Sequence, residues 1–253
     1  MKKIAFITGA TAGIGEACAT EFAKNGYDLI VSGRRDDRLK KLSSSLEKQF
    51  DIDVLPLVFD VRDRKAVEDN FRGLPAEWMK INVLVNNAGL ASGLDPLQEG
   101  NPDDWEKMID TNVKGLLYVT HQVVRGMVER GTGHIINIGS LAGKEVYPQG
   151  NVYCSTKHAV DAITKGLRID LIGTGVKVTQ ISPGLVETEF SLVRFKGDVE
   201  KAKKVYQGYE PLTAKDVAEQ VCYVASLPRR VNINDLVLTA LDQANSYVVN
   251  KEV

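Results

Sequence analysis

Short and almost continuous apolar runs recur along the whole chain and alternate with segments of helical spacing. The runs span residues 3–8, 27–32, 53–59, 82–86, 134–138, 176–182 and 235–240. Continuous rather than alternating apolar runs are typical of parallel strands that helices cover on both faces. We therefore expect one α/β domain over residues 1–253. It would be a doubly wound Rossmann fold with a seven-stranded parallel sheet of order 3-2-1-4-5-6-7.

Two local features refine this expectation. Pro56 lies inside the third run and has no backbone N–H to donate, which predicts that this strand is at an edge of the sheet. Apolar residues spaced three or four apart between Trp105 and Thr120 predict one long helix. No stretch rich in Pro, Gly or Ser divides the chain, and one irregular insertion is expected at 184–212, where it would cover the substrate.

Composition argues against several classes of protein. The 253 residues carry 32 basic and 33 acidic side chains without a long block of one sign, so no nucleic-acid or membrane-surface partner is expected. The three cysteines form no CxxC pair and the three histidines lack metal-site spacing, so no metal is expected. The apolar start is too short for a signal peptide, and no run reaches transmembrane length, which favours a cytoplasmic location.

A glycine-rich turn follows the first apolar run directly. Residues 8–15 read T-G-A-T-A-G-I-G and open the first helical segment. Gly9 would permit a tight turn, Gly13 the close approach of a pyrophosphate, and Gly15 close contact between helix and strand. Backbone N–H groups at the helix start would hydrogen-bond the phosphate oxygens. The turn therefore predicts a dinucleotide site.

Tyr153 and Lys157 stand four residues apart on a predicted helix, so their side chains share one face. Tyrosine is a poor base at neutral pH because its ordinary pKa is about 10. A lysine cation beside it would lower that pKa and make Tyr153 a proton shuttle. Ser140 follows the fifth strand, at the end of the sheet where ligands bind, and would hydrogen-bond the substrate oxygen.

The ordered motifs resemble the short-chain dehydrogenase/reductase family over essentially the whole chain. They are the glycine turn, N-N-A-G at 86–89, a lone Asn112, Ser140, Y-C-S-T-K at 153–157 and P-G-L-V-E-T at 183–188. The resemblance implies Ser140, Tyr153, Lys157 and Asn112 as catalytic residues. Asn112 would hold a water in a proton relay to Lys157, which would also bind the nicotinamide ribose.

The same resemblance implies a set of cofactor-binding residues. Thr188 would contact the nicotinamide carboxamide, and Asp60 would contact the adenine, although a plain surface turn remains open for Asp60. The full set is Gly9, Thr11, Ala12, Gly13, Ile14, Gly15, Arg34, Arg35, Asp60, Val61, Asn87, Ala88, Gly89, Tyr153, Lys157, Pro183, Gly184, Val186 and Thr188.

The residues after the second strand predict which dinucleotide is bound. A carboxylate at the strand end would bind the ribose hydroxyls and repel a 2′-phosphate, but the chain has Gly33, Arg34 and Arg35 there. Arginine forms charge-assisted bonds with phosphate, which favours NADP. The pair could also be a solvated helix start beside acidic neighbours. Whether Arg34 alone or both arginines hold the phosphate is left open.

Several further stretches resemble the branch of that family that acts on small 3-hydroxy acids such as L-serine, L-allo-threonine and 3-hydroxypropionate. They include LPAEW (74–78), VRFKGD (193–198) and LPRRVNIN (227–234). Arg194 is the candidate clamp for the substrate carboxylate, unless it is an exposed arginine or a subunit contact. The branch implies a homotetramer. Alternatives are a reductase of 3-oxoacyl carrier protein or of a diketone, and a non-catalytic NADP-binding regulator.

Overall fold

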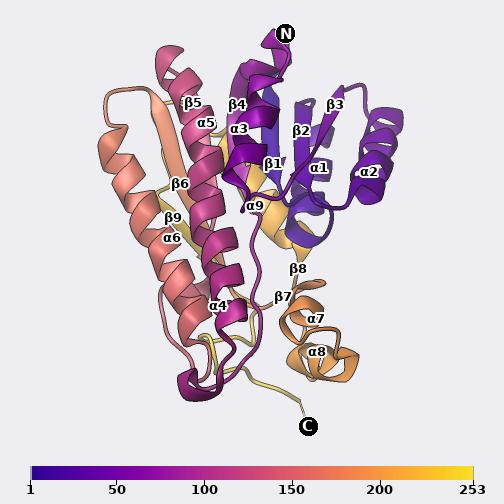
Figure 1. Cartoon of the computed structure of the whole chain (residues 1–253), viewed down its shortest axis with the longest axis vertical. Coiled ribbons are helices and arrows are strands. Elements are labelled where there is room, and N and C mark those ends of the chain that lie inside the picture. Colours follow the sequence, from indigo (N-terminus) through magenta and orange to yellow (C-terminus); the bar gives the residue numbers. More distant parts are fainter. Residues whose placement is uncertain (1, 253) are drawn as a thin grey trace.

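The computed structural model describes residues 2–252, and a parallel sheet of seven strands forms its centre (Figure 1). The strand order β3-β2-β1-β4-β5-β6-β9 is the doubly wound order expected from the sequence, with β9 as the seventh strand of the sheet. The strands are β1 (Ile4–Thr8), β2 (Asp28–Gly33), β3 (Val54–Val58), β4 (Ile81–Asn86), β5 (Gly133–Ile138), β6 (Val176–Pro183) and β9 (Asp235–Leu238).

Strand β3 forms one edge of the sheet, as Pro56 predicts. In the register of the β2–β3 pair, Pro56 lies opposite Val31. The missing N–H of the proline is tolerated because no further strand pairs with the outer side of β3 within residues 2–252.

Helices cover both faces of the sheet and produce three layers. One face packs against α1 (Gly13–Lys24), α2 (Asp36–Gln49) and α9 (Ala214–Ser226); the other packs against α3 (Arg64–Arg72), α5 (Leu116–Glu129) and α6 (Asn151–Asp170). Neighbouring residues of β1 show why both faces are apolar, since Phe6 and Ile7 are fully buried in opposite cores. In Figure 1, α3, α5 and α6 lie in front of the sheet.

The long helix expected from Trp105 to Thr120 is interrupted. It consists of α4 (Pro102–Ile109), a π-helical turn at Asp110–Gly115, and α5. Gly115 packs so closely on the strand-end loop that an added Cβ would lie 2.7 Å from a methyl carbon of Val61. The sequence could not predict this wider turn, because contacts from other elements decide it.

The carboxyl ends of the sheet strands meet the 184–212 insertion in the lower half of Figure 1. The insertion is more regular than expected. It contains β7 (Val186–Glu187), α7 (Phe190–Arg194) and α8 (Val199–Tyr206), and β7 pairs with β8 (Leu212–Thr213) in a small parallel sheet. None of the helices described between residues 2 and 252 has the length and apolar character needed to cross a membrane.

Candidate active site

A cavity of about 760 Å³ opens at the carboxyl ends of the strands. It is lined by every residue predicted from the sequence to bind cofactor or substrate, except Gly15. An added Cβ on Gly15 would lie 2.3 Å from the carbonyl oxygen of Gly9, so the role of Gly15 is close packing of helix on turn. Asn112 also lies outside the lining.

The glycine-rich turn is held in a conformation that suits a phosphate. Gly9 and Gly13 adopt φ angles of +68° and +58°, which side chains rarely adopt. An added Cβ on Gly9 would lie 2.9 Å from the Cα of Ala88. The Asn87 side chain donates hydrogen bonds to the carbonyls of Thr8 and Gly9, at 2.9 and 3.2 Å. Helix α1 begins here without a side-chain cap in the described structure, which leaves its first N–H groups for an anion.

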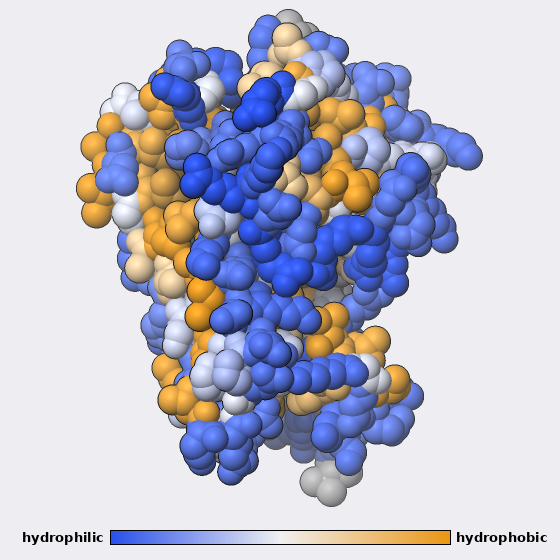
Figure 2. All heavy atoms as spheres, viewed as in Figure 1, coloured by the Kyte–Doolittle hydropathy of each residue, from blue (hydrophilic) through white to orange (hydrophobic). Residues whose placement is uncertain are grey.

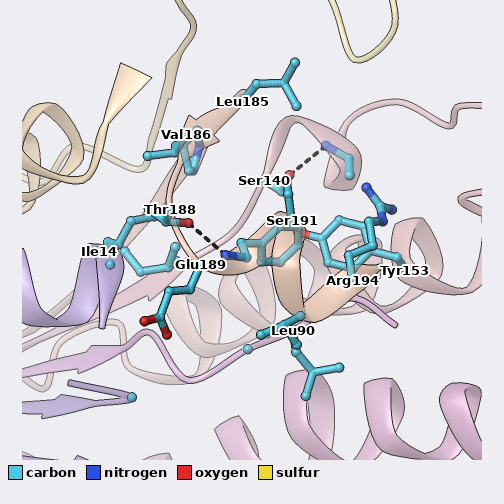
Figure 3. A pocket seen from close by; sticks show the side chains of 18 of the residues that line it. Ile14, Leu90, Ser140, Tyr153, Leu185, Val186, Thr188, Glu189, Ser191 and Arg194 are labelled. Carbon is cyan, nitrogen blue, oxygen red and sulfur yellow. Dashed lines mark hydrogen bonds between the residues drawn. The ribbon is translucent and has the colours of Figure 1, made fainter. Parts of the chain in front are cut away.

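Helix α6 places Tyr153 and Lys157 on the cavity, and both side chains are buried. The Lys157 Nζ donates a hydrogen bond of 2.9 Å to the carbonyl oxygen of Ile138 at the end of β5. Burial lowers the pKa of Lys157 to about 8. Ser140 starts a short 3₁₀ turn, where its hydroxyl oxygen accepts a 3.1 Å bond from the N–H of Ala142 (Figure 3).

The sequence predicts that Lys157 lowers the pKa of Tyr153, and this prediction is wrong. Burial raises the pKa of Tyr153 above its ordinary value, and the nearby Tyr147 raises it further. Arg194 and a hydrogen bond from Ser140 oppose this shift without overcoming it. The loss of solvent around a phenolate therefore outweighs the nearby positive charge, which the sequence spacing could not show.

The Asn112 side chain is fully engaged within the π turn. Its Oδ1 accepts from the N–H of Leu90 at 2.9 Å, and its Nδ2 donates to the Leu90 carbonyl at 2.8 Å and to the Thr156 hydroxyl at 3.0 Å. An added Cβ on Gly89 would lie 3.3 Å from Asn112 Oδ1 and 3.7 Å from Lys157 Nζ. Asn112 therefore lies close behind Lys157, and its water-relay role stays a prediction.

The two arginines after β2 differ in their surroundings. Arg34 is mostly exposed, and its Nη1 is 3.8 Å from a carboxylate oxygen of Asp60. Arg35 lies over the glycine-rich turn, where its Nε and Nη2 donate to the Thr11 hydroxyl at 3.1 and 2.7 Å. Asp60 also accepts a 2.7 Å bond from Arg62. Both arginines and Asp60 line the cavity.

Glu189 also lines this end of the cavity, and Arg38 contacts it from outside the lining; both residues were missed in the sequence. The Glu189 carboxylate accepts from Arg35 Nη1 at 3.0 Å and from Arg38 Nη1 at 2.8 Å. Hydrogen bonds from Arg38 and Arg35 lower the pKa of Glu189. In Figure 3, this carboxylate points away from Tyr153 and Arg194. Helical spacing after Arg35 could have suggested Arg38, but no sequence signal marks Glu189.

Arg194, at the end of α7, reaches the other end of the cavity (Figure 3). Its guanidinium carbon lies 5.3 Å from the ring centroids of both Tyr147 and Tyr153 and 6.0 Å from that of Phe190. It donates a hydrogen bond to the Tyr147 hydroxyl. Its Nε is buried and has no hydrogen-bond partner among residues 2–252. A cation with an unused donor beside Tyr153 can receive an anion.

The C-terminal tail, which follows β9, also lines the cavity through Gln243, Ser246, Tyr247, Val249 and Lys251. Gln243 Oε1 accepts a 2.8 Å hydrogen bond from the N–H of Leu185. The tail is therefore attached to the start of the 184–212 insertion.

The coincidence of the phosphate turn, the Ser-Tyr-Lys group and the switch point of a doubly wound sheet defines a dinucleotide-dependent oxidoreductase. Residues 3–198 match the family model described as short chain dehydrogenase. The chain belongs to that family.

Three relatives illustrate the similarity. An NADP-dependent 3-hydroxy acid dehydrogenase of Salmonella typhi is 52% identical over 242 residues, which is 95% of this chain and 96% of the relative. A sulfoacetaldehyde reductase of Chromohalobacter salexigens is 45% identical over 254 residues and the full length of both chains. The closed form of a serine dehydrogenase complexed with NADP⁺ superposes with a TM-score of 0.92 at 49% identity, covering 99% of this chain and 100% of that structure.

Proposed function

We propose that this protein is an NADP-dependent dehydrogenase that interconverts the 3-hydroxyl and 3-oxo groups of small 3-hydroxy acids. The observation that carries this proposal is the position of Arg194, whose guanidinium lies 5.3 Å from the Tyr153 ring. A substrate oxygen at Tyr153 and an anionic group at Arg194 would then belong to one small molecule. The names of the Salmonella dehydrogenase and the NADP⁺-bound serine dehydrogenase support the same choice.

The residues of the cavity have complementary roles in this reaction. The nicotinamide of NADP, when bound, supplies the hydride acceptor or donor. Tyr153 transfers the proton at the substrate oxygen, and Ser140 hydrogen-bonds the same oxygen. Lys157 lies one helical turn from Tyr153 and is oriented by the Ile138 carbonyl, so that it can bind the ribose and return the proton.

The basic end of the cavity supports NADP rather than NAD. Arg35 donates to the Thr11 hydroxyl, Arg38 Nη1 donates to the Thr11 carbonyl oxygen at 3.5 Å, and Arg34 lines the same cavity as Arg35. Guanidinium groups of this kind bind a 2′-phosphate through several charge-assisted hydrogen bonds. We therefore assign the 2′-phosphate to Arg35 together with Arg34, with Arg38 as an additional contributor.

The substrate class follows from the short separation of the anion and carbonyl positions. In a 3-oxo acid, one methylene separates the carboxylate from the carbonyl. Sulfoacetaldehyde, named in the Chromohalobacter relative, has a sulfonate in the same place. A diketone or a 3-oxoacyl carrier protein has no anion there, so the buried donor of Arg194 favours the acids.

Steady-state kinetics with NADP tests this assignment. We expect oxidation of L-serine, L-allo-threonine, 3-hydroxypropionate or 3-hydroxybutyrate, with acetoacetyl thioester and diketone reduction as competitors. Arg194→Met should raise KM for the acids about 10- to 100-fold, because a charged hydrogen bond is lost. Arg230→Met, on the exposed surface, is the matched control. Activity on the thioester alone would overturn the substrate class, and full turnover by Tyr153→Phe would overturn the mechanism.

We propose that residues 1–253 act as one domain, that the 184–212 insertion covers the substrate, and that the protein is a cytoplasmic homotetramer. The insertion supports its covering role by contributing Thr188, Phe190 and Arg194 to the cavity lining. Exposed isoleucines at the end of α6 support the assembly.

A further inference from the structure

The chain segment that carries Arg194 is attached to the rest of the molecule at a second place, outside the cavity. The carbonyl oxygen of Arg194 accepts a 2.9 Å hydrogen bond from the N–H of Gly93. Two residues later, Lys196 Nζ lies 2.7 Å from Oδ2 of Asp104 at the start of α4. The other carboxylate oxygen of Asp104 accepts a 2.7 Å bond from the Ser92 hydroxyl.

The backbone at Lys196 has an unusual conformation. Its φ angle of +54° is left-handed, and it ends α7 with its own N–H bonded to the Val193 carbonyl at 3.1 Å. Glycine is the usual residue at such a helix end, and asparagine is the next most tolerant. A lysine is unfavourable there on conformational grounds. The contact of its side chain with Asp104 offers a reason for its presence.

Asp104 is a firm attachment point. Its side chain is buried, and so is Ser92. Burial alone would raise the pKa of Asp104, but hydrogen bonds from Lys196 and Ser92 lower it below the ordinary value. The carboxylate is therefore charged at neutral pH, and a buried carboxylate without its cation would be strongly disfavoured. The ion pair thus joins a buried carboxylate on α4 to a partly exposed lysine just after α7.

We propose that Lys196 and Asp104 are positioning residues that set substrate selectivity by holding Arg194 over Tyr153, an inference that rests on the proposed function. The Gly93 bond fixes the backbone of Arg194, and the ion pair fixes the turn that follows it. Neither residue touches Tyr153 or Lys157 in the described contacts. Loss of the Lys196–Asp104 ion pair weakens the binding of an anionic group by Arg194 and leaves proton transfer by Tyr153 intact.

The test compares an acid with its uncharged counterpart of the same shape. 3-Hydroxypropionate and 3-hydroxypropionamide differ in charge at the position that Arg194 would contact. The variant is Lys196→Asn, which keeps a residue that tolerates the left-handed conformation and removes the cation. Lys196→Arg restores the charge. Lys203→Asn, which removes an exposed ion pair with Glu200 on the same insertion, is the matched control.

We expect Lys196→Asn to raise KM for the acid about tenfold, equivalent to about 1.4 kcal/mol. The KM for the amide, kcat and NADP affinity should each stay within about twofold, a difference below 0.5 kcal/mol. Lys196→Arg should retain both the preference for the acid and the thermal unfolding midpoint, whereas Lys196→Asn should lower that midpoint, because the buried Asp104 carboxylate loses its cation.

Two results would overturn the inference while leaving the proposed function intact: an unchanged KM for the acid in Lys196→Asn, or an equal rise of KM for the acid and the amide. A wild-type protein that does not distinguish the acid from the amide would overturn the proposed substrate class and the inference with it. The wild-type and variant measurements therefore separate the two failures.

Discussion

Lys157 shows at the scale of one residue how function and stability oppose each other. Burial lowers the pKa of its ammonium to about 8, compared with about 10.4 in an unfolded chain. Below pH 8 the folded protein therefore holds a charge at an unfavourable site. We predict that Lys157→Met stabilises the protein at pH 7 by up to about 3 kcal/mol while abolishing turnover.

The dependence on pH identifies the cause. Between about pH 8 and 10.4 the unfolded chain binds a proton that the folded chain has released, so wild-type stability rises and the advantage of Lys157→Met shrinks. Denaturant unfolding at pH 7, 8 and 9.5 measures this difference. Lys165→Met, on the exposed face of the same helix, is the control. An advantage that grows with pH would contradict the explanation.

Single residues also show which parts of the site a sequence can predict. The positions of Tyr153, Lys157 and Ser140 follow from helix spacing and strand ends, and the structure brings all three to one cavity. The pKa of Tyr153 does not follow, because burial beside Tyr147 determines it. Likewise, Arg34 and Arg35 look equivalent in sequence, but of the two only Arg35 donates a hydrogen bond to the Thr11 hydroxyl.

At the scale of elements, Glu189 joins the start of α2 to the start of α7. Its carboxylate neutralises Arg35 and Arg38, the same groups that we assign to the 2′-phosphate of NADP. The Glu189 carboxylate and a 2′-phosphate bound by the same arginines would repel each other. We predict that Glu189→Gln lowers the NADP dissociation constant about threefold, since exposed charge pairs contribute about 0.2–1 kcal/mol.

NAD binding should not change in Glu189→Gln, because NAD has no 2′-phosphate. Isothermal titration with both cofactors measures the difference, and Glu187→Gln, at the neighbouring exposed position in β7, is the control. Weaker NADP binding by Glu189→Gln would instead mean that the carboxylate orients the arginines for the phosphate.

The elements themselves were predictable in proportion to their apolar content. Each of the seven sheet strands follows from an apolar run, because burial between two helical layers requires one. The strands β7 and β8 have two residues each and no such run, so pairing with each other defines them. The π turn at Asn112 depends on contacts with Leu90 and Thr156, which lie far from it in sequence.

At the scale of the whole molecule, the cavity joins three parts of the chain that the sequence does not relate to one another. The doubly wound sheet with its helices provides the phosphate turn and the Tyr-Lys pair, the 184–212 insertion provides Arg194, and the C-terminal segment provides Gln243. Strand order determines only the first of these. The other two depend on packing between distant segments, which a strand pattern does not predict.

The outer surface leads to a prediction about assembly. Figure 2 shows apolar side chains gathered on the flank formed by α6. Ile169 and Ile172 are 73% and 85% exposed there, an unfavourable position for large apolar groups in a monomer. We predict that this flank is buried between copies of the chain. Light scattering should then give four times the chain mass for the wild type and a smaller mass for a double variant, Ile169→Asp with Ile172→Asp.

The control for this experiment is Val199→Asp, because Val199 is also exposed but lies on α8, away from the α6 flank (Figure 1). A charge there should leave the mass unchanged, whereas a charge at the flank costs desolvation in each subunit contact. Far-ultraviolet circular dichroism checks that the double variant keeps its fold. A double variant with the wild-type mass would place the subunit contacts elsewhere, and a monomeric wild type would rule out the tetramer.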